Sequence, residues 1–429
     1  MRHALKDNVK LPIYKSKYLF LNSYNNQIWP GEKCPGLVKI EENMSSENNA
    51  ESQWSSVHVC VLSSSAIAPV LSPLLDRQLG CKSVVVIATR DNAERFEFLK
   101  EVLNNHQIDA QLKVISSVFD IETLRQELSE LLVSLVDERP LVNVTVGSKP
   151  LSIVLHEQAV VLDFPVYYLN TNDQLSWFWP KHQPMIELED RIKCAQFLRA
   201  HGLSVESAES PQMRPGLVDV FSDLLSDFAQ RSELILILNR LANRAGKHYQ
   251  AVLTKAELAN AELRAFLQRL DEHGCIRFKR DEVDFINEQR HFFANGGWLE
   301  YWVHVHLNRL KQKLPALQHH LASVELQCRA TGVKNEIDNL LLYNNNLYLV
   351  ECKTVRFKAG AKPAVDVIYK LDTLQKQLGG VLGKGLLVSF YPITERELER
   401  ARLYGIEVIH GEQLARLEDY LMRWLIKKR

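Results

Sequence analysis

The stretch NEIDNLLLYNNNLYLVECKT (335–354) decides how the C-terminal part of this chain folds. Two apolar runs flank an Asn-rich turn, and asparagine tolerates the left-handed backbone of tight hairpin turns. The pattern predicts a β-hairpin with residues 344–345 at its turn. In that register Asp338 faces Glu351 on the neighbouring strand.

Two carboxylates that face each other at the end of an apolar hairpin repel, and their burial adds a desolvation cost. A divalent cation between Asp338 and Glu351 would remove both costs, because magnesium and manganese take carboxylate oxygens. Side chains alternate along a strand, so Lys353 shares the face of Glu351. The alternative is a solvated hairpin end with an ordinary Glu/Lys pair.

Composition limits the classes of protein this can be. A chain of 429 residues suggests two to four domains, and 52 basic residues balance 52 acidic ones, so nucleic-acid binding would need a local surface. The seven cysteines include no C-x-x-C pair, which argues against a disulfide framework and a structural zinc site. With no apolar run of spanning length, we expect a cytoplasmic protein without a membrane segment.

Residues 1–55 end in a polar stretch and are predicted to be a poorly ordered extension. From 56 to 180 strand and helix patterns alternate, which predicts a Rossmann-like parallel sheet covered by helices on both faces. The expected strands are 57–62, 83–89, 110–115, 141–146 and 164–169, and the expected helices are 69–79, 92–106, 121–135 and 151–162.

Residues 181–230 are interpreted as a connector with one helix at 186–200, and residues 231–291 as a winged-helix-like module. Its second helical stretch mixes Arg264 and Arg269 with several acidic residues, whereas phosphate contact favours a one-sided basic face. A spacer or dimerisation role is therefore favoured over DNA reading.

The last predicted domain, 292–429, begins with a helix that is apolar on most sides and is expected to be buried. Glu300 lies on its apolar stripe with Val303 and Leu307, where it needs a salt-bridge partner or a cation. The hairpin, a helix at 365–378, a strand at 385–390 and a terminal helix pair follow.

This order of features resembles the PD-(D/E)XK nuclease fold, an α/β architecture, although no proline precedes the Asp. The family pattern maps to Glu300, Asp338, Glu351 and Lys353, followed by a helix that contains Gln375. The resemblance implies that the carboxylates, Asp338 and Glu351 with help from Glu300, hold magnesium or manganese. It implies that Lys353 orients or deprotonates the attacking water and that Gln375 places the water shell or the nucleic-acid backbone.

Two strand ends in the first domain carry small polar loops, at 63–66 (SSSA) and 147–150 (GSKP). Backbone N–H groups at helix starts, the hydroxyls of Ser63, Ser64 and Ser65, and Lys149 could bind an anion. An ordinary turn with an N-cap is the alternative for each loop. Neither loop has a dinucleotide or P-loop motif.

The segment NVTVGSKP (143–150) resembles the signature of CRISPR-associated Rossmann fold (CARF) sensor domains, with Val146 where a small residue is common. The matching positions are Asn143, Thr145, Gly147, Ser148 and Lys149. Such domains form dimers and bind cyclic oligoadenylate across the two-fold axis, which suits an isologous interface.

The whole order resembles the CRISPR ancillary nucleases that cyclic tetra-adenylate switches on in type III CRISPR defence. The resemblance implies a homodimer that cleaves DNA, as single strands or by nicking, with RNA left open as a second substrate. We expect the middle module to carry the signal from the effector loops to the catalytic residues. The alternatives are an ungated repair or restriction nuclease and a nucleotide-responsive DNA-binding regulator.

Overall fold

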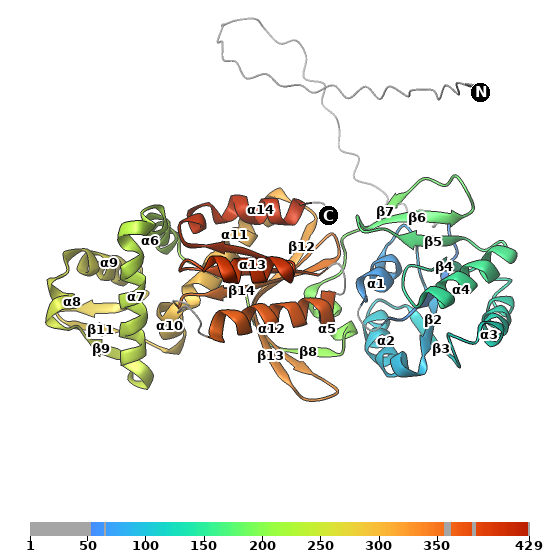
Figure 1. Ribbon diagram of the computed structural model, residues 1–429, viewed down its shortest axis with the longest axis horizontal. Helices are drawn as coiled ribbons and strands as arrows, with labels where there is room; N and C mark the ends of the chain where they lie inside the picture. The colour runs from blue at the N-terminus through green and yellow to red at the C-terminus, as the bar shows by residue number, and fades with distance from the viewer. Residues whose placement is uncertain (1–52, 64–65, 356–361, 380–382, 428–429) are drawn as a thin grey trace, which may run out of the picture. The chain divides into compact units, whose positions relative to one another are not determined.

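The computed structural model describes residues 53–63, 66–355, 362–379 and 383–427 (Figure 1). The predicted extension lies outside the described residues except for its last few positions, as do Ser64 and Ser65. No helix of the described part is long and apolar enough to cross a membrane.

The first domain is the parallel α/β sheet that the sequence predicts. Its strands run in the order β3-β2-β1-β4-β5-β6-β7, parallel from β3 to β5 and antiparallel after that. The strands are β1 (Val57–Val61), β2 (Ser83–Thr89), β3 (Asp109–Ile115), β4 (Leu141–Asn143), β5 (Val166–Leu169), β6 (Gln174–Trp179) and β7 (Ile186–Glu187). The helices are α1 (Ala68–Leu75), η1 (Arg90–Arg95), α2 (Phe96–Asn104), α3 (Ile121–Val133) and α4 (Lys149–Val161).

The strand order reverses at β1, which pairs with β2 on one side and with β4 on the other. The connections after β1 and β4 therefore leave the carboxyl edge at the same point, where open α/β sheets form their ligand crevice. Helices α3 and α4 pack together on one face of the sheet (Figure 1). The fold thus brings the loops that begin at Ser63 and Val144 to one crevice.

The predicted connector contributes to the nuclease sheet. Helix α5 (Cys194–Ala200) is shorter than the predicted helix 186–200, whose first residues form β7. The next segment, β8 (Leu203–Glu209), pairs antiparallel with β12 (Leu317–Cys328) at the edge of that sheet. The alternation of small, polar and acidic residues in LSVESAE hid this strand, because an edge strand needs little apolar surface.

The middle module has the helix, strand, helix pair and two-stranded wing of a winged helix. Its elements are α6 (Pro215–Ser226), α7 (Phe228–Ala245), η2 (Gly246–His248), β9 (Gln250–Val252), α8 (Lys255–Ala259), α9 (Ala261–Glu272), β10 (Arg277–Lys279), β11 (Glu282–Asp284) and α10 (Glu288–Phe292). Helices α6 and α7 pack on the short segments η3 and η4 of the last domain. Asn239 of α7 donates to the carbonyl of Thr354, 3.2 Å away, so the module contacts the end of the predicted hairpin.

The last domain is a six-stranded sheet in the order β16-β15-β14-β13-β12-β8. Its strands are β12 (Leu317–Cys328), β13 (Lys334–Tyr343), β14 (Asn346–Lys353), β15 (Lys384–Ser389) and β16 (Ile406–His410). Its helices are η3 (Phe293–Gly297), α11 (Trp298–Lys313), α12 (Lys362–Gly379), α13 (Glu395–Leu403), η4 (Gly411–Arg416) and α14 (Leu417–Ile426). Helices α11 and α14 pack together, as do α12 and α13.

The hairpin has the predicted register. Asn344 and Asn345 both take the left-handed backbone, with φ of 46° and 54°, and Leu340 pairs with Leu349. Side chains alternate between two buried clusters, so Leu349 packs with the α12 side and Val350 with the α11 side. Glu351 has the parity of Leu349 and therefore points toward α12.

Candidate nuclease and sensor sites

Asp338 and Glu351 lie on neighbouring strands at the same end of the hairpin. Both are buried, with 5% and 4% of their surface exposed. The Oδ2 of Asp338 accepts a hydrogen bond of 2.6 Å from the backbone N–H of Cys352. The strand backbone thus fixes one carboxylate oxygen.

Two lysines neutralise Glu351. The Nζ of Lys353 donates to its Oε1 at 2.7 Å and lies 3.7 Å from the Oδ2 of Asp338. The Nζ of Lys370, on helix α12, donates to both carboxylate oxygens of Glu351, at 3.1 and 2.9 Å. The site therefore combines two acidic and two basic side chains in a largely buried place.

The charges of this cluster shift the pKa values of Asp338 and Lys353. Burial and the nearby Glu351 raise the pKa of Asp338 to about 6. Burial alone would lower the pKa of Lys353, but Asp338 and Glu351 outweigh it and raise that pKa above its usual range. This shift describes the site without a cation, because a cation on the same two carboxylates would offset the charges that raise the pKa of Lys353.

Glu300 does not join the two hairpin carboxylates in one ligand set. It lies on α11, and its Oε2 accepts a hydrogen bond of 3.2 Å from the hydroxyl of Ser323. Burial, with the charges of Asp338 and Glu336, raises its pKa to about 9. Among the residues described here, no three His, Cys, Asp or Glu side chains are arranged to hold a metal ion. The structure therefore brings Asp338 and Glu351 together with Lys353 and Lys370, and Glu300 bonds to Ser323 instead.

Gln375 is also not placed where the resemblance implies. Its Nε2 donates to the carbonyl of Tyr404, 3.2 Å away, and it lies against Gly385. Lys370 reaches the carboxylates instead. Five residues separate the two positions, and this corresponds to about 140° of rotation around a helix, so they cannot share a face. Lys370 is a site residue that the sequence prediction did not include, since spacing along α12 does not show which face of the helix packs on the hairpin.

Asp338 and Glu351 fit a divalent cation. Both are buried acidic side chains on one hairpin end, and the repulsion between them raises the pKa of Asp338. A cation between them would relieve that repulsion, and hard oxygen ligands suit magnesium or manganese.

The sensor loop after β4 is fixed by its own side chains. Asn143 donates to the carbonyl of Pro69 at 2.9 Å, and its Oδ1 accepts from the N–H of Thr145 at 2.9 Å. The Oγ1 of Thr145 accepts from the N–H of Leu169 at 2.8 Å. These side-chain bonds replace the strand ladder, which is why β4 ends at Asn143 instead of continuing to the predicted residue 146.

Residues 147–149 of this loop are exposed. Gly147 has a φ of 114°, and a Cβ there would lie 2.9 Å from the Cγ1 of Val61, so only glycine fits. Ser148 caps α4 by accepting from the N–H of Leu151 at 3.5 Å. Lys149 is exposed at the first position of the helix. The structure thus brings Gly147, Ser148 and Lys149 to the helix start beside the strand that leads to Ser63.

Fold and sites together define a ligand-binding Rossmann-like domain joined to a restriction-endonuclease-like domain. The family described as Card1 CARF domain matches residues 57–197, and the family described as Card1-like, endonuclease domain, matches residues 287–428. The chain therefore carries a CARF sensor domain and a nuclease domain of the Card1 type, as the resemblance predicts. The comparison with curated proteins finds no match.

Three solved structures are similar over most of this chain. Protein VC1899 from Vibrio cholerae is 26% identical, with a TM-score of 0.80, covering 86% of this chain and 97% of that one. Can2 from Sulfobacillus thermosulfidooxidans, in complex with cyclic tetra-adenylate, is 21% identical, with a TM-score of 0.72, covering 86% and 99%. A type III CRISPR defence DNA nuclease activated by cyclic oligoadenylate is 15% identical, with a TM-score of 0.51, covering 80% and 47%.

Proposed function

We propose that this protein is a metal-dependent nuclease of type III CRISPR defence that cyclic tetra-adenylate switches on and that cleaves DNA. The observation that carries the proposal is the buried hairpin end with Asp338, Glu351 and Lys353, in a chain with a Card1 CARF domain and a Card1-like endonuclease domain. The similarity of the fold to the Can2 complex supports cyclic tetra-adenylate as the effector.

In this proposal Asp338 and Glu351 hold magnesium or manganese, with Glu300 able to join them once a cation is present. The bound cation supplies Lewis-acid polarisation of the scissile phosphate and a more acidic water. Lys353 and Lys370, which donate to Glu351 in this structure, are free to turn to phosphate oxygens when Glu351 binds a cation. They then stabilise the negative charge that develops on the phosphate.

The proposed effector site is formed by the loop that begins at Ser63 and by Gly147, Ser148 and Lys149. A cyclic ligand with repeated phosphates would bind two copies of this site, one from each subunit of a homodimer. The exposed Lys149 and the helix start at α4 supply positive charge for those phosphates.

A DNA-reading role for the middle module has little support. On α9, Arg269 pairs with Asp223 at 2.8 Å, and Arg264 donates to the carbonyl of Leu258. Glu262 of the same helix pairs with Arg231 at 3.4 Å. Arginines that are engaged within the protein leave less positive surface for phosphates, so the regulator alternative is disfavoured.

The experiment compares cleavage of labelled single-stranded DNA, supercoiled DNA and RNA by the wild-type protein. Each substrate is tested with magnesium, with manganese and with a chelator, in the presence and absence of cyclic tetra-adenylate. We expect metal-dependent DNA cleavage that the effector stimulates. Cleavage that persists in the chelator would contradict the metal assignment, and absence of cleavage in all conditions would contradict the nuclease assignment.

A further inference from the structure

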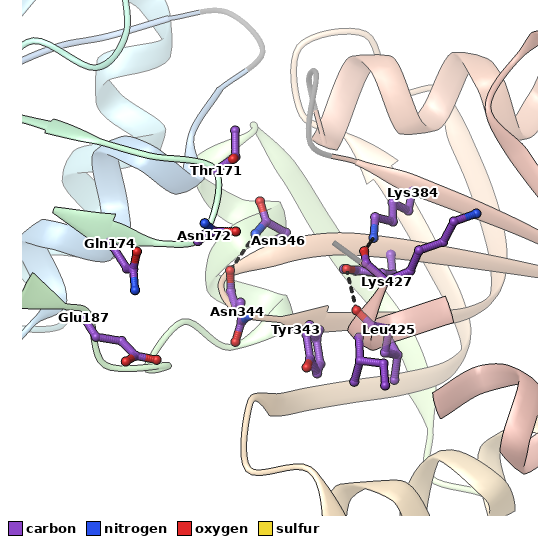
Figure 2. A pocket seen from close by; sticks show the side chains of 12 residues that line it. Thr171, Asn172, Gln174, Glu187, Tyr343, Asn344, Asn346, Lys384, Leu425 and Lys427 are labelled. Carbon is purple, nitrogen blue, oxygen red and sulfur yellow. Dashed lines mark hydrogen bonds between the residues drawn. The ribbon is translucent and has the colours of Figure 1, made fainter. Parts of the chain in front are cut away.

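The tip of the catalytic hairpin is inserted into the sensor domain. Asn345 is buried, with 1% of its surface exposed. Its Nδ2 donates to the Oδ2 of Asp173 at 2.5 Å and to the carbonyl of Glu189 at 3.3 Å. The neighbouring turn residues Asn344 and Asn346 line a cavity of about 420 Å³ between this tip and the sensor strands (Figure 2).

One route from the effector site to Asn345 begins at Thr145. Its hydroxyl accepts from the N–H of Leu169, the last residue of β5. The turn that follows β5 carries Asp173, a carboxylate with 7% of its surface exposed. A shift of the loop at Thr145 therefore displaces the residue that holds Asn345, with only a short turn between them.

A second route begins at the loop after β1, which leads into α1. The residue after α1, Asp76, accepts from the N–H of Glu189 at 2.7 Å, and the carbonyl of Glu189 accepts from Asn345. Asn143 is tied to the same helix through the carbonyl of Pro69, at 2.9 Å. Both effector loops are thus connected to the same amide group.

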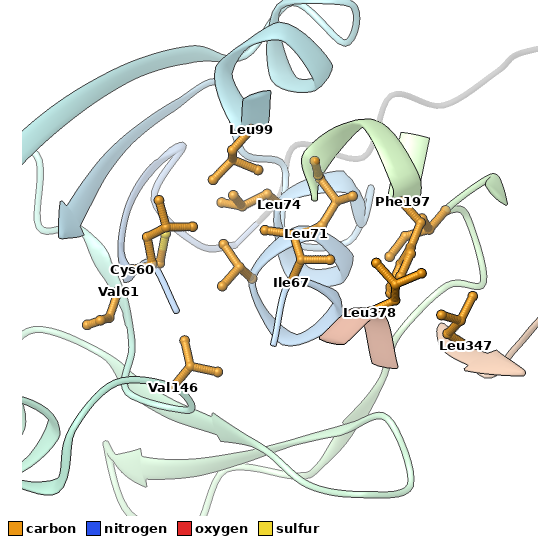
Figure 3. Packing of buried hydrophobic residues seen from close by; sticks show 14 of the residues in the cluster. Cys60, Val61, Ile67, Leu71, Leu74, Leu99, Val146, Phe197, Leu347 and Leu378 are labelled. Atoms are coloured by element: carbon orange, nitrogen blue, oxygen red, sulfur yellow. The ribbon is translucent and has the colours of Figure 1, made fainter. Parts of the chain in front are cut away.

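Apolar packing makes the junction between the sensor domain and the hairpin tip stiff. Ile67, just before α1, and Leu71, within it, belong to one buried cluster with Phe197 of α5 and with Leu347 and Leu378 of the nuclease domain (Figure 3). Leu347 follows Asn345 by two residues on β14. Since packed interiors resist deformation, a movement of α1 is passed to β14 with little loss.

The hairpin connects this junction to the active site. Its strands carry Asp338 and Glu351 at the end away from the turn, and Asn345 is further anchored by Gln318, which donates to its Oδ1 and accepts from its backbone N–H, both at 2.8 Å. We propose that Asn345, held by Asp173 and the Glu189 carbonyl, is the positioning residue that couples effector binding to the catalytic hairpin within one subunit. This inference rests on the proposed effector-activated function.

This route differs from the one expected from the sequence, which ran through the middle module. That module packs on η3 and η4 of the nuclease domain, whereas the sensor contacts the nuclease domain through α5, through the hairpin tip and through the ion pair of Glu101 on α2 with Arg329. The middle module is therefore a support of the catalytic strand, and the direct contact is the path available to the signal.

The test uses Asn345→Asp, which keeps a residue that tolerates the left-handed backbone and keeps the acceptor for Gln318. It removes the donor to Asp173 and Glu189 and places a second carboxylate against Asp173. The matched control is Asn344→Asp, the same change one residue earlier, at a position with the same backbone conformation and a φ of 46°.

Three quantities are measured in the full-length protein: binding of cyclic tetra-adenylate by calorimetry, DNA cleavage without effector, and the stimulation of cleavage by effector. For Asn345→Asp we expect binding within about threefold of wild type, unchanged effector-free cleavage, and stimulation reduced at least tenfold. Asn344→Asp is expected to match wild type. Exchanging donor and acceptor, by combining Asp173→Asn with Asn345→Asp, should recover part of the stimulation.

The outcomes separate the two claims. Normal stimulation in Asn345→Asp would overturn the coupling role and leave the proposed function intact. Loss of effector binding in that variant would also overturn it, because the residue would then belong to the effector site. A wild-type protein that cleaves without responding to effector would overturn the proposed gating, and the coupling with it. If Asn345→Asp fails to fold, Asp173→Gly decides the same point, because it removes the acceptor of Asn345 at a position whose φ of 59° suits glycine.

Discussion

The polar residues of the catalytic hairpin and of the effector loop after β4 (143–149) lie in opposite environments. Asp338 and Glu351 are buried side by side, and burial and the neighbouring charge raise the pKa of Asp338 to about 6. In the effector loop, Asn143 and Thr145 are satisfied by hydrogen bonds within the fold. The groups that we assign to the ligand, such as Lys149, are exposed.

The two regions should therefore respond differently to substitution. At the hairpin, the repulsion between Asp338 and Glu351 is unfavourable for stability, but it creates a place where a cation can bind. Substitutions there should therefore reduce activity more than stability. The effector loop is defined by its backbone shape, and substitutions that alter this shape should damage stability and binding together.

The largest effect is expected for Glu351→Gln. The change keeps the volume and a hydrogen-bond acceptor for Lys353 and Lys370 but removes a charge that a cation needs, so cleavage should fall by about a thousandfold or more. Cleavage rates at saturating metal and effector, with circular dichroism as a check on folding, provide the measurement. Glu336→Gln, an exposed position on the same hairpin, is the control. Activity within tenfold of wild type would remove Glu351 from the catalytic set.

The next effect is expected in the sensor domain. Lys149→Ala should weaken binding of cyclic tetra-adenylate by about tenfold, because a partly exposed charged contact to phosphate contributes about 1 to 2 kcal/mol. Effector-free cleavage should not change. Calorimetric titration of the variant beside Lys82→Ala, an exposed lysine at the start of β2, checks this. Equal affinity in both variants would show that Lys149 does not contact the effector.

Gly147→Ala should reduce both stability and effector affinity. Its φ of 114° and the 2.9 Å approach of Val61 to a new Cβ predict a loss of about 1 to 3 kcal/mol in the free energy of unfolding. Gly246→Ala is the control, since it also has a positive φ, 52°, but a Cβ there meets nothing within 4 Å. Denaturant titration should show the larger loss for Gly147→Ala. The reverse order would mean that the close approach to Val61 is not limiting.

The smallest effect concerns stability without metal. Because burial raises the pKa of Glu300 to about 9, the folded protein holds a proton there that the unfolded chain releases above its own pKa near 4.5. Stability is therefore lost as the pH rises between these two values. Glu300→Gln should raise the Tm at pH 8 in chelator, and this gain should vanish near pH 4. A gain of equal size at both pH values would assign the effect to packing.

Much of the fold follows from the sequence. Local sequence patterns are enough to predict a continuous apolar strand, such as 83–89, and the Asn-rich turn at 344–345. The structure has both. The predicted strand 141–146 is longer than β4. Side-chain hydrogen bonds of Asn143 and Thr145 compete with the backbone hydrogen bonds between strands, so the strand ends at Asn143. Strand β8 was missed because an edge strand has half-polar composition.

The sites were predictable to a smaller extent. Hairpin register follows from the turn, so the approach of Asp338 to Glu351 could be deduced. The contact of Lys370 with Glu351, and of Asn345 with Asp173, depends on how separate elements pack, and neither can be obtained from spacing along one element. The role of Gln375 is predicted from its position in the family pattern alone, whereas in the structure its side chain donates to the carbonyl of Tyr404.

The most direct test of the central claim is the rate of DNA cleavage as a function of cyclic tetra-adenylate concentration, at fixed metal concentration, with effector binding measured on the same preparation. We predict a rate that rises at least tenfold, with a midpoint that matches the Kd and with no rise for Glu351→Gln. A rate that is the same with and without bound effector would contradict the account, because the sensor and nuclease domains would then act independently.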